Sequence, residues 1–254
     1  MPEVRLEREG HIAWLILDNP DKRNAVNGKM SQQIKDAYKK IESNPDIRVV
    51  IITGVGDKAF CSGGDMSTYL ERGVLGKDGT GKPYGILKPT EITKPIIAAM
   101  KGYCLAGGFG LALACDLRIA DTNLRMGPSA LKRGLVPAAQ QAERLVKLVP
   151  FGKALEILLL SKYVDAQEAL DLGLVQHVVE TDEVLNVAKE WAEIIASYPP
   201  EAVRETKKMA YETLVMDWEK SFKYGAEVME KSYKTDQGRD GFVAYFDKRA
   251  KAKS

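Results

Sequence analysis

The sequence predicts an α/β protein in which short buried strands alternate with helices, followed by a helical extension at the C-terminal end. Three observations lead to this prediction: unbroken apolar runs of strand length, amphipathic stretches between them, and a final segment with helical spacing and no strand candidates. With 254 residues and 45% apolar content, the chain is long enough to bury one large core without help from disulfides.

The first elements read as strand, helix, strand. The run HIAWLILD from His11 predicts a buried strand that ends at the turn signal NPD. Between residues 28 and 43, apolar side chains recur at steps of three and four, which predicts an amphipathic helix. Its apolar face is formed by Met30, Ile34, Ala37, Tyr38 and Ile41. The β-branched run VVIITG at 49–54 suits a strand of a parallel sheet that is covered on both faces.

The same theme returns in the middle of the chain. Strands are expected at 95–102 and 116–121, with GGFGLALAC between them as a short buried helix. Residues 72–93 are rich in Gly, Lys and Pro and lack an apolar period, so we expect a surface loop that could close over a ligand. After His177 the spacing is helical. We therefore expect a core over residues 1–195 and a helical segment over 196–254.

Composition excludes several classes of partner. Lys plus Arg (37) nearly balances Asp plus Glu (35), so no overall field would hold a nucleic acid or an anionic membrane. The three cysteines have no paired CxxC spacing, which argues against a zinc site and a disulfide framework and fits a reducing cytoplasm. No apolar stretch approaches the length of a membrane span, and the N-terminus lacks a signal-peptide pattern.

Two glycine-rich turns are the strongest candidates for chemistry. AFCSGGDM from Ala59 and GYCLAGGFGLALACD from Gly102 each follow a buried strand and each open a helix. Bare amide groups at such helix starts point outward with the positive end of the helix dipole behind them. Facing one point, two such turns would form an oxyanion hole. Taken alone, each turn is more simply explained by tight packing at a strand–helix junction, and the presence of both turns in this order favours the functional explanation.

The order of the motifs resembles the enoyl-CoA hydratase/isomerase (crotonase) family. The segments that carry the resemblance are NPDKRNAV, DKAFCSGGDM and KPIIAAMKGYCLAGGFGLALACDLRIAD, followed by GLVP, ERL, AQEALDLGLVQHVV and FDKR. The resemblance spans nearly the whole chain. It implies a crotonase-like spiral of repeated β-β-α units, with a C-terminal helical segment used for assembly as a homotrimer or a dimer of trimers.

The resemblance also implies positions for the site. The oxyanion-hole amides fall on Gly64 and Gly107. The acyl-CoA substrate, which carries its own coenzyme A so that no separate cofactor or metal is expected, would contact Lys22, Arg23, Ala25, Lys58, Cys61, Gly63, Asp65, Met66, Gly108, Ser129, Ala130 and Lys248. Lys248 would act across a subunit boundary. Asp65 and Asp116 are expected to be structural, and surface charge is the alternative role of the lysines.

The chain departs from the family pattern at both catalytic carboxylates. Hydratases of the family place two glutamates as general base and general acid. The first position is Gly110, and the second is Ser129, or Ala130 if one extra residue before Pro137 is absorbed earlier. A carboxylate that some family isomerases hold just after the later proline is replaced by Ala138. Classical hydration would lose roughly 100- to 10,000-fold for each missing group.

Few other side chains could replace these glutamates. His11 and His177 lie outside the family's active-site segments and are expected to be structural. Better candidates are Glu143, in the helix after Pro137, and three residues in or beside the loop: Tyr69, Glu71 and Tyr84.

Several functions remain open. We favour an acyl-CoA lyase that is hydratase-like and stabilises an enolate; a decarboxylase or hydrolase of the same family needs fewer acid–base groups. The alternative from a different functional class is a protein that binds acyl-CoA without catalysing a reaction. A nucleotide-binding Rossmann protein is disfavoured because neither turn reads GxGxxG.

Overall fold

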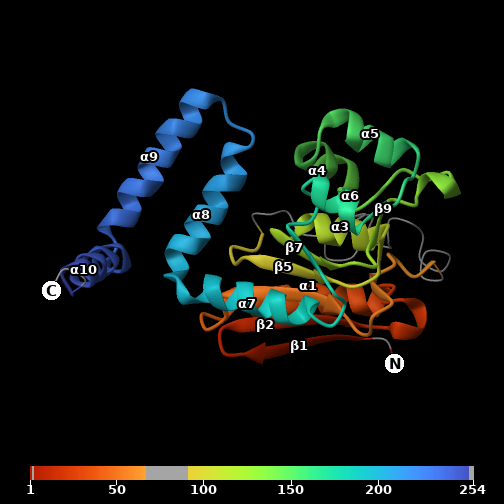
Figure 1. The fold of residues 1–254 in the computed structure, drawn as a ribbon, viewed down its shortest axis with the longest axis horizontal. Helices are drawn as coiled ribbons and strands as arrows, with labels where there is room; N and C mark the ends of the chain where they lie inside the picture. Colours follow the sequence, from red (N-terminus) through yellow and green to blue (C-terminus); the bar gives the residue numbers. More distant parts are fainter. Residues whose placement is uncertain (2, 67–90, 252–254) are drawn as a thin grey trace.

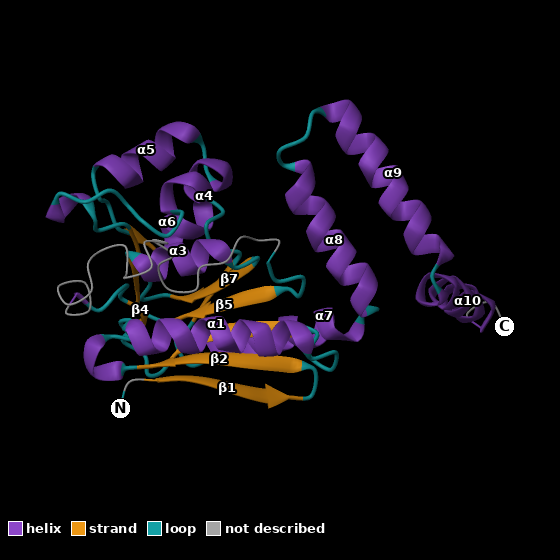
Figure 2. Ribbon diagram, turned by 180° about the vertical axis from the view of Figure 1, so that it is seen from behind, coloured by secondary structure: helices purple, strands orange, loops and turns teal. Residues whose placement is uncertain are grey.

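A six-stranded sheet forms the centre of the molecule (Figures 1 and 2). The structure, a computed structural model, describes residue 1 and residues 3–66 and 91–251. β1 and β2 form an antiparallel hairpin, and all further neighbours in this sheet are parallel. The order of strands is β1 (Glu3–Glu9), β2 (Ile12–Asp18), β3 (Val49–Gly54), β5 (Ile96–Met100), β7 (Leu117–Asp121) and β10 (His177–Val179).

A second, four-stranded sheet receives the chain after each central strand of the first. Its order is β4 (Ala59–Cys61), β6 (Tyr103–Leu105), β8 (Arg125–Gly127) and β9 (Val164–Asp165). Along the chain β3 leads to β4, β5 to β6 and β7 to β8. The helix α3 (Gly107–Ala114) follows β6 and returns the chain to the large sheet. This alternation produces a spiral of β-β-α units.

The first helix lies where its apolar spacing predicted it. α1 (Gly28–Ser43) buries the five apolar side chains of its predicted face. The side chain of Asn27 caps its start by accepting a hydrogen bond from the Met30 amide, and Asn44 is its C-cap. β3 likewise has the bounds expected for VVIITG. β1 was not anticipated, because its alternating charged sequence leaves most of its side chains exposed at the edge of the sheet.

Helices cover both faces of the large sheet. α1 and the second sheet cover one face, and α7 (Val184–Ser197) covers the other (Figures 1 and 2). Alanines at a four-residue spacing, Ala188, Ala192 and Ala196, let α7 pack closely on this face. The remaining core helices are α4 (Gln141–Leu148), α5 (Phe151–Leu159) and α6 (Ala166–Asp171), with 3-10 turns at Pro20–Lys22 and Leu131–Arg133.

Three helices extend away from this core: α8 (Pro200–Thr213), α9 (Trp218–Lys234) and α10 (Asp236–Lys251) (Figure 1). The expected boundary at 195/196 falls within the last turn of α7. In the described part of the chain, none of the helices combines the length and the apolar character that crossing a bilayer requires.

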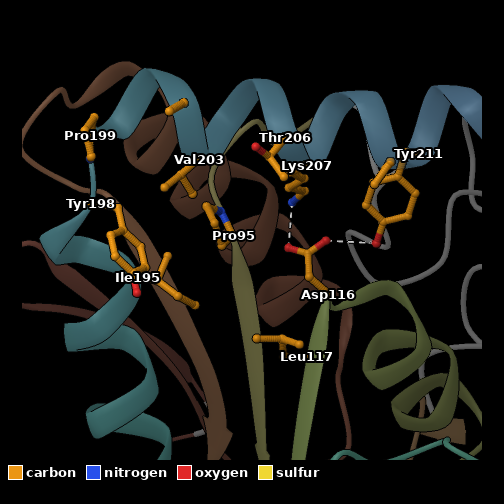
Figure 3. A pocket seen from close by; sticks show the side chains of 12 residues that line it. Pro95, Asp116, Leu117, Ile195, Tyr198, Pro199, Val203, Thr206, Lys207 and Tyr211 are labelled. Atoms are coloured by element: carbon orange, nitrogen blue, oxygen red, sulfur yellow. Dashed lines mark hydrogen bonds and ion pairs between the residues drawn. The ribbon is translucent and has the colours of Figure 1, made fainter. Parts of the chain in front are cut away.

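A partly buried polar network links α8 to the core (Figure 3). The carboxylate of Asp116 accepts hydrogen bonds from Lys207 Nζ (2.8 Å), Tyr211 Oη (2.8 Å) and the Ile96 amide (2.7 Å). Burial and the neighbouring carboxylate raise the pKa of Tyr211, so its hydroxyl stays a donor. An apolar pocket of about 710 Å³ lies beside this network, at the amino-terminal ends of β5 and β7. The network explains why Asp116 has a structural role.

Candidate functional site

The two glycine-rich turns lie against each other. β4 and β6 are parallel neighbours with Cys61 opposite Cys104, so the turns that follow them leave the same edge of the small sheet. A β-carbon built on Gly63 would lie 3.1 Å from the Gly107 nitrogen and 2.9 Å from the Ala106 β-carbon. The backbones at 63 and 107 are therefore in direct contact, and a side chain at 63 would separate them.

Both turns hold backbone conformations that L-residues rarely adopt. Gly63 has φ +107°, and Ala106, the N-cap of α3, has φ 50° and ψ −117°. Strained residues of this kind cluster at functional sites, where the surrounding structure holds them in place. Gly107 is the first residue of α3, so its amide has no partner within the helix. Within the described residues, neither this amide nor that of Gly64 donates a backbone hydrogen bond.

Backbone hydrogen bonds join the segment DKRNAV to the first glycine-rich turn, AFCSGGDM. The Val26 amide donates to the Gly63 carbonyl (2.8 Å), and the Val26 carbonyl accepts from the Asp65 amide (2.9 Å). The Ser62 amide donates to the Arg23 carbonyl (3.0 Å). These bonds fix residues on both sides of Gly64 and leave its own amide out of the ladder.

Several residues expected to contact the substrate surround these turns. Lys22 Nζ lies 2.7 Å from the Asp65 carboxylate, and this lysine is 54% exposed. The Arg23 guanidinium lies 4.9 Å from the centre of the Tyr103 ring. Lys58 is exposed and its carbonyl accepts from the Tyr103 amide. Ala25 is buried, and Met66 is exposed at the end of the turn. The Lys22 ammonium is thus paired with the carboxylate of the first turn, and Arg23 lies over the ring at the start of β6.

Cys61 and Gly108 form the contact beneath the two turns. A β-carbon on Gly108 would lie 2.1 Å from the Cys61 carbonyl oxygen, so only glycine fits there. The Cys61 side chain is buried, and burial raises the pKa of its thiol to about 12. Cys61 therefore remains a thiol at neutral pH and is not a nucleophile.

At Gly110 the space for a side chain is filled. A β-carbon there would lie 2.6 Å from the Ala139 carbonyl oxygen and 2.7 Å from the Ala139 β-carbon. Ala139 and Gln140 form a turn with φ 65° and φ 54°, and Gln141 after them is buried. Reasoning from the sequence missed this turn, because nothing in the sequence near Gly110 indicates a neighbour so far along the chain. The turn at Ala139 therefore occupies the space that a glutamate side chain would need at position 110.

The second expected glutamate position holds a hydroxyl. The Gly127 carbonyl accepts from the Ala106 amide (3.0 Å), which places the segment after β8 beside the start of α3. Ser129 is buried, and its Oγ accepts a hydrogen bond from Arg133 Nη1 (3.1 Å). Ala130 follows it, partly buried. Neither residue supplies a group that exchanges protons near neutral pH.

The other candidates lie elsewhere. Glu143 is exposed on α4, and His11 Nδ1 lies 2.8 Å from the Asp46 carbonyl oxygen. His177 is exposed, and its ring lies 5.9 Å from the Trp191 ring in a tilted arrangement. Lys248 belongs to α10, at the far end of the helical extension from its own core (Figure 1). The candidates Tyr69, Glu71 and Tyr84, and loop residues 72–90, lie outside the described residues. Among residues that the structure does describe, no group of three potential metal ligands occurs.

The chain is similar to known proteins in sequence and in structure. Residues 7–253 match the family model for enoyl-CoA hydratase/isomerase. The (E)-benzylidenesuccinyl-CoA hydratase of Thauera aromatica is 34% identical, with 98% of each chain covered. The short-chain-enoyl-CoA hydratase of Clostridium acetobutylicum is 32% identical, covering 97% of this chain and 95% of the relative.

A solved structure of enoyl-CoA hydratase from Mycobacterium tuberculosis superimposes with a TM-score of 0.90, at 31% identity, over 98% of this chain and 97% of that one. Relatives of the same kind include a carnitinyl-CoA dehydratase of Proteus mirabilis at 32% identity. Similarity over almost the entire length, in sequence and in three dimensions, shows that this chain belongs to the enoyl-CoA hydratase/isomerase family and has the crotonase fold.

Proposed function

We propose that this protein is an acyl-CoA thioester enzyme in which the amides of Gly64 and Gly107 form an oxyanion hole. The supporting observation is the contact between the two turns: a β-carbon added to Gly63 would lie only 3.1 Å from the Gly107 nitrogen. Two amides held rigidly beside one oxygen would stabilise the negative charge of an enolate as it develops. Gly107 lies at the start of α3, whose dipole favours the same charge.

The reaction is hydratase-like in this proposal, with acid–base support that differs from the family's glutamates. Neither position holds a carboxylate. Ala139 fills the space for a side chain at Gly110, and the Ser129 hydroxyl accepts a hydrogen bond from Arg133. Decarboxylation of a malonyl-type thioester is the second candidate. It is favoured by these same observations, because loss of carbon dioxide demands stabilisation of the enolate and no general base.

A substrate panel and one substitution test the proposal. Enoyl-, malonyl- and acetyl-type CoA thioesters are assayed with the wild-type protein and with Gly107→Pro, which removes the amide donor at the first residue of α3. Circular dichroism checks the fold of this variant, because proline disfavours the backbone conformation of Ala106 before it. We expect turnover of at least one thioester and a loss of roughly 100- to 1,000-fold in kcat in the variant. Tight binding of thioesters without any turnover would instead support the non-catalytic binder.

The helical extension is proposed to assemble the protein as a homotrimer or a dimer of trimers. Its apolar side chains face solvent in the single chain, and those between residues 214 and 243 are Leu214, Val215, Trp218, Phe222, Met229, Tyr233, Phe242 and Val243. Exposed apolar side chains gathered on one segment commonly mark a protein–protein interface. Sedimentation equilibrium should give a mass of three or six times the chain's 28.0 kDa, and a monomer would contradict the proposal.

A further inference from the structure

Gln141 carries a buried acceptor that has no partner. This first residue of α4 is 2% exposed, and its Nε2 donates to the Ala138 carbonyl (2.7 Å). Its Oε1 is buried and accepts no hydrogen bond from any described residue. Leaving a buried acceptor unpaired destabilises the folded state, so native structures commonly pair such an atom with an ordered water molecule.

The position of Gln141 connects this acceptor with the candidate site. Ala139, in the same turn, fills the space at Gly110, which lies three residues beyond Gly107 in α3. The amide of Gln141 folds back onto Ala138 and so lies beside the turn that replaces the expected carboxylate. The unpaired oxygen therefore belongs to the residue that directly follows the turn packed against Gly110, the position of the first family glutamate.

The conformation of the turn adds an independent observation. Ala139 and Gln140 are consecutive non-glycine residues with positive φ, a strained conformation that persists only where other contacts hold it. The side chain of Gln140 is paired, because its Oε1 accepts from Arg144 Nη2 (2.9 Å). Of the two neighbouring glutamines, Gln141 is the one whose side-chain oxygen is buried and has no partner among the described residues.

We propose that Gln141 is a positioning residue that holds a water molecule beside the thioester through its Oε1. The inference rests on the proposed function, and it applies to hydration or hydrolysis, which both consume a water. A glutamine oxygen accepts a hydrogen bond and orients the water, but it does not take up the proton. Orienting the water matters for the reaction rate, because a misplaced reactant can lower that rate by up to about 100-fold.

Two variants separate positioning from folding. Gln141→Met keeps the side-chain volume and removes the acceptor; we expect kcat to fall by about 10- to 100-fold with KM unchanged. The variant also loses the hydrogen bond from Nε2 to the Ala138 carbonyl, so its melting temperature is measured beside kcat and should fall by no more than about 2–4 °C. Gln141→Glu keeps an acceptor, so it should retain more turnover than Gln141→Met and gain a new pH dependence. Gln167→Met, on the exposed face of α6, is the matched control and should change nothing.

Two results would overturn the inference. One is a Gln141→Met enzyme whose kcat lies within about twofold of the wild type. The other is a high-resolution crystal structure of the wild type in which no water lies within hydrogen-bonding distance of Oε1. If the wild type turns over no thioester, the proposed function fails, and this crystal structure alone decides the inference: an ordered water between Gln141 and Gly107 upholds it.

Discussion

Gly110→Ala should destabilise the protein even though alanine is the better helix former. In α3 a β-carbon at this position would meet the Ala139 carbonyl oxygen at 2.6 Å and its β-carbon at 2.7 Å. Both are parts of a strained turn that cannot rotate away as a flexible side chain would. Overpacking of this kind costs about 1–3 kcal/mol, and the gain in helix propensity is about 0.5–1 kcal/mol. We therefore expect a net loss of about 1–2 kcal/mol.

Gly152→Ala is the matched control. Gly152 also lies in a helix, α5, but its β-carbon would meet no atom within 4 Å, so this substitution should stabilise the protein by up to about 1 kcal/mol. Urea unfolding of the two variants gives both free energies, and for a chain of this size each kcal/mol corresponds to about 2–4 °C in Tm. A Gly110→Ala protein as stable as Gly152→Ala would refute the view that Ala139 fills the glutamate position.

Three further results are expected. Gly110→Glu should not create efficient hydration in a thioester assay, because the new carboxylate has no space beside Ala139; turnover raised 100-fold or more would contradict this. Asp116→Ala should lower the free energy of unfolding in urea by about 3 kcal/mol or more, because it leaves Lys207 partly buried without its carboxylate. The control Glu230→Ala breaks an exposed ion pair with Lys234 and should lower it by less than about 1 kcal/mol. Cys61 and Cys115 should resist iodoacetamide at pH 8 in the native protein. Burial raises the pKa of each thiol from 9.0 to about 12, which lowers the thiolate fraction about a thousandfold. Rapid labelling of the native protein, detected by mass spectrometry, would be inconsistent with this packing.

Local patterns in the sequence were sufficient for much of the fold. α1 has the bounds that its apolar spacing predicted, because Asn27 and Asn44 cap a helix whose buried face repeats every three to four residues. β3 was equally clear from its β-branched run. β1 was missed, since an edge strand with charged side chains has no apolar pattern of its own.

The candidate site depends on contacts between residues distant in the sequence. Motif order placed Gly64 and Gly107 in two separate turns, and the pairing of β4 with β6 brings those turns together. The absence of a carboxylate at Gly110 was visible in the sequence, but its replacement by Ala139 was not, because the contact joins α3 to the turn before α4. Gln141 looks like an ordinary polar residue until its burial is known.

The convergence of two amides on one oxygen is the central claim, and a crystal structure with a bound acyl-CoA thioester tests it most directly. We expect the thioester oxygen to lie about 2.7–3.1 Å from the nitrogens of both Gly64 and Gly107. A thioester oxygen bound by neither amide, or by one of them with the other pointing away, would contradict the account.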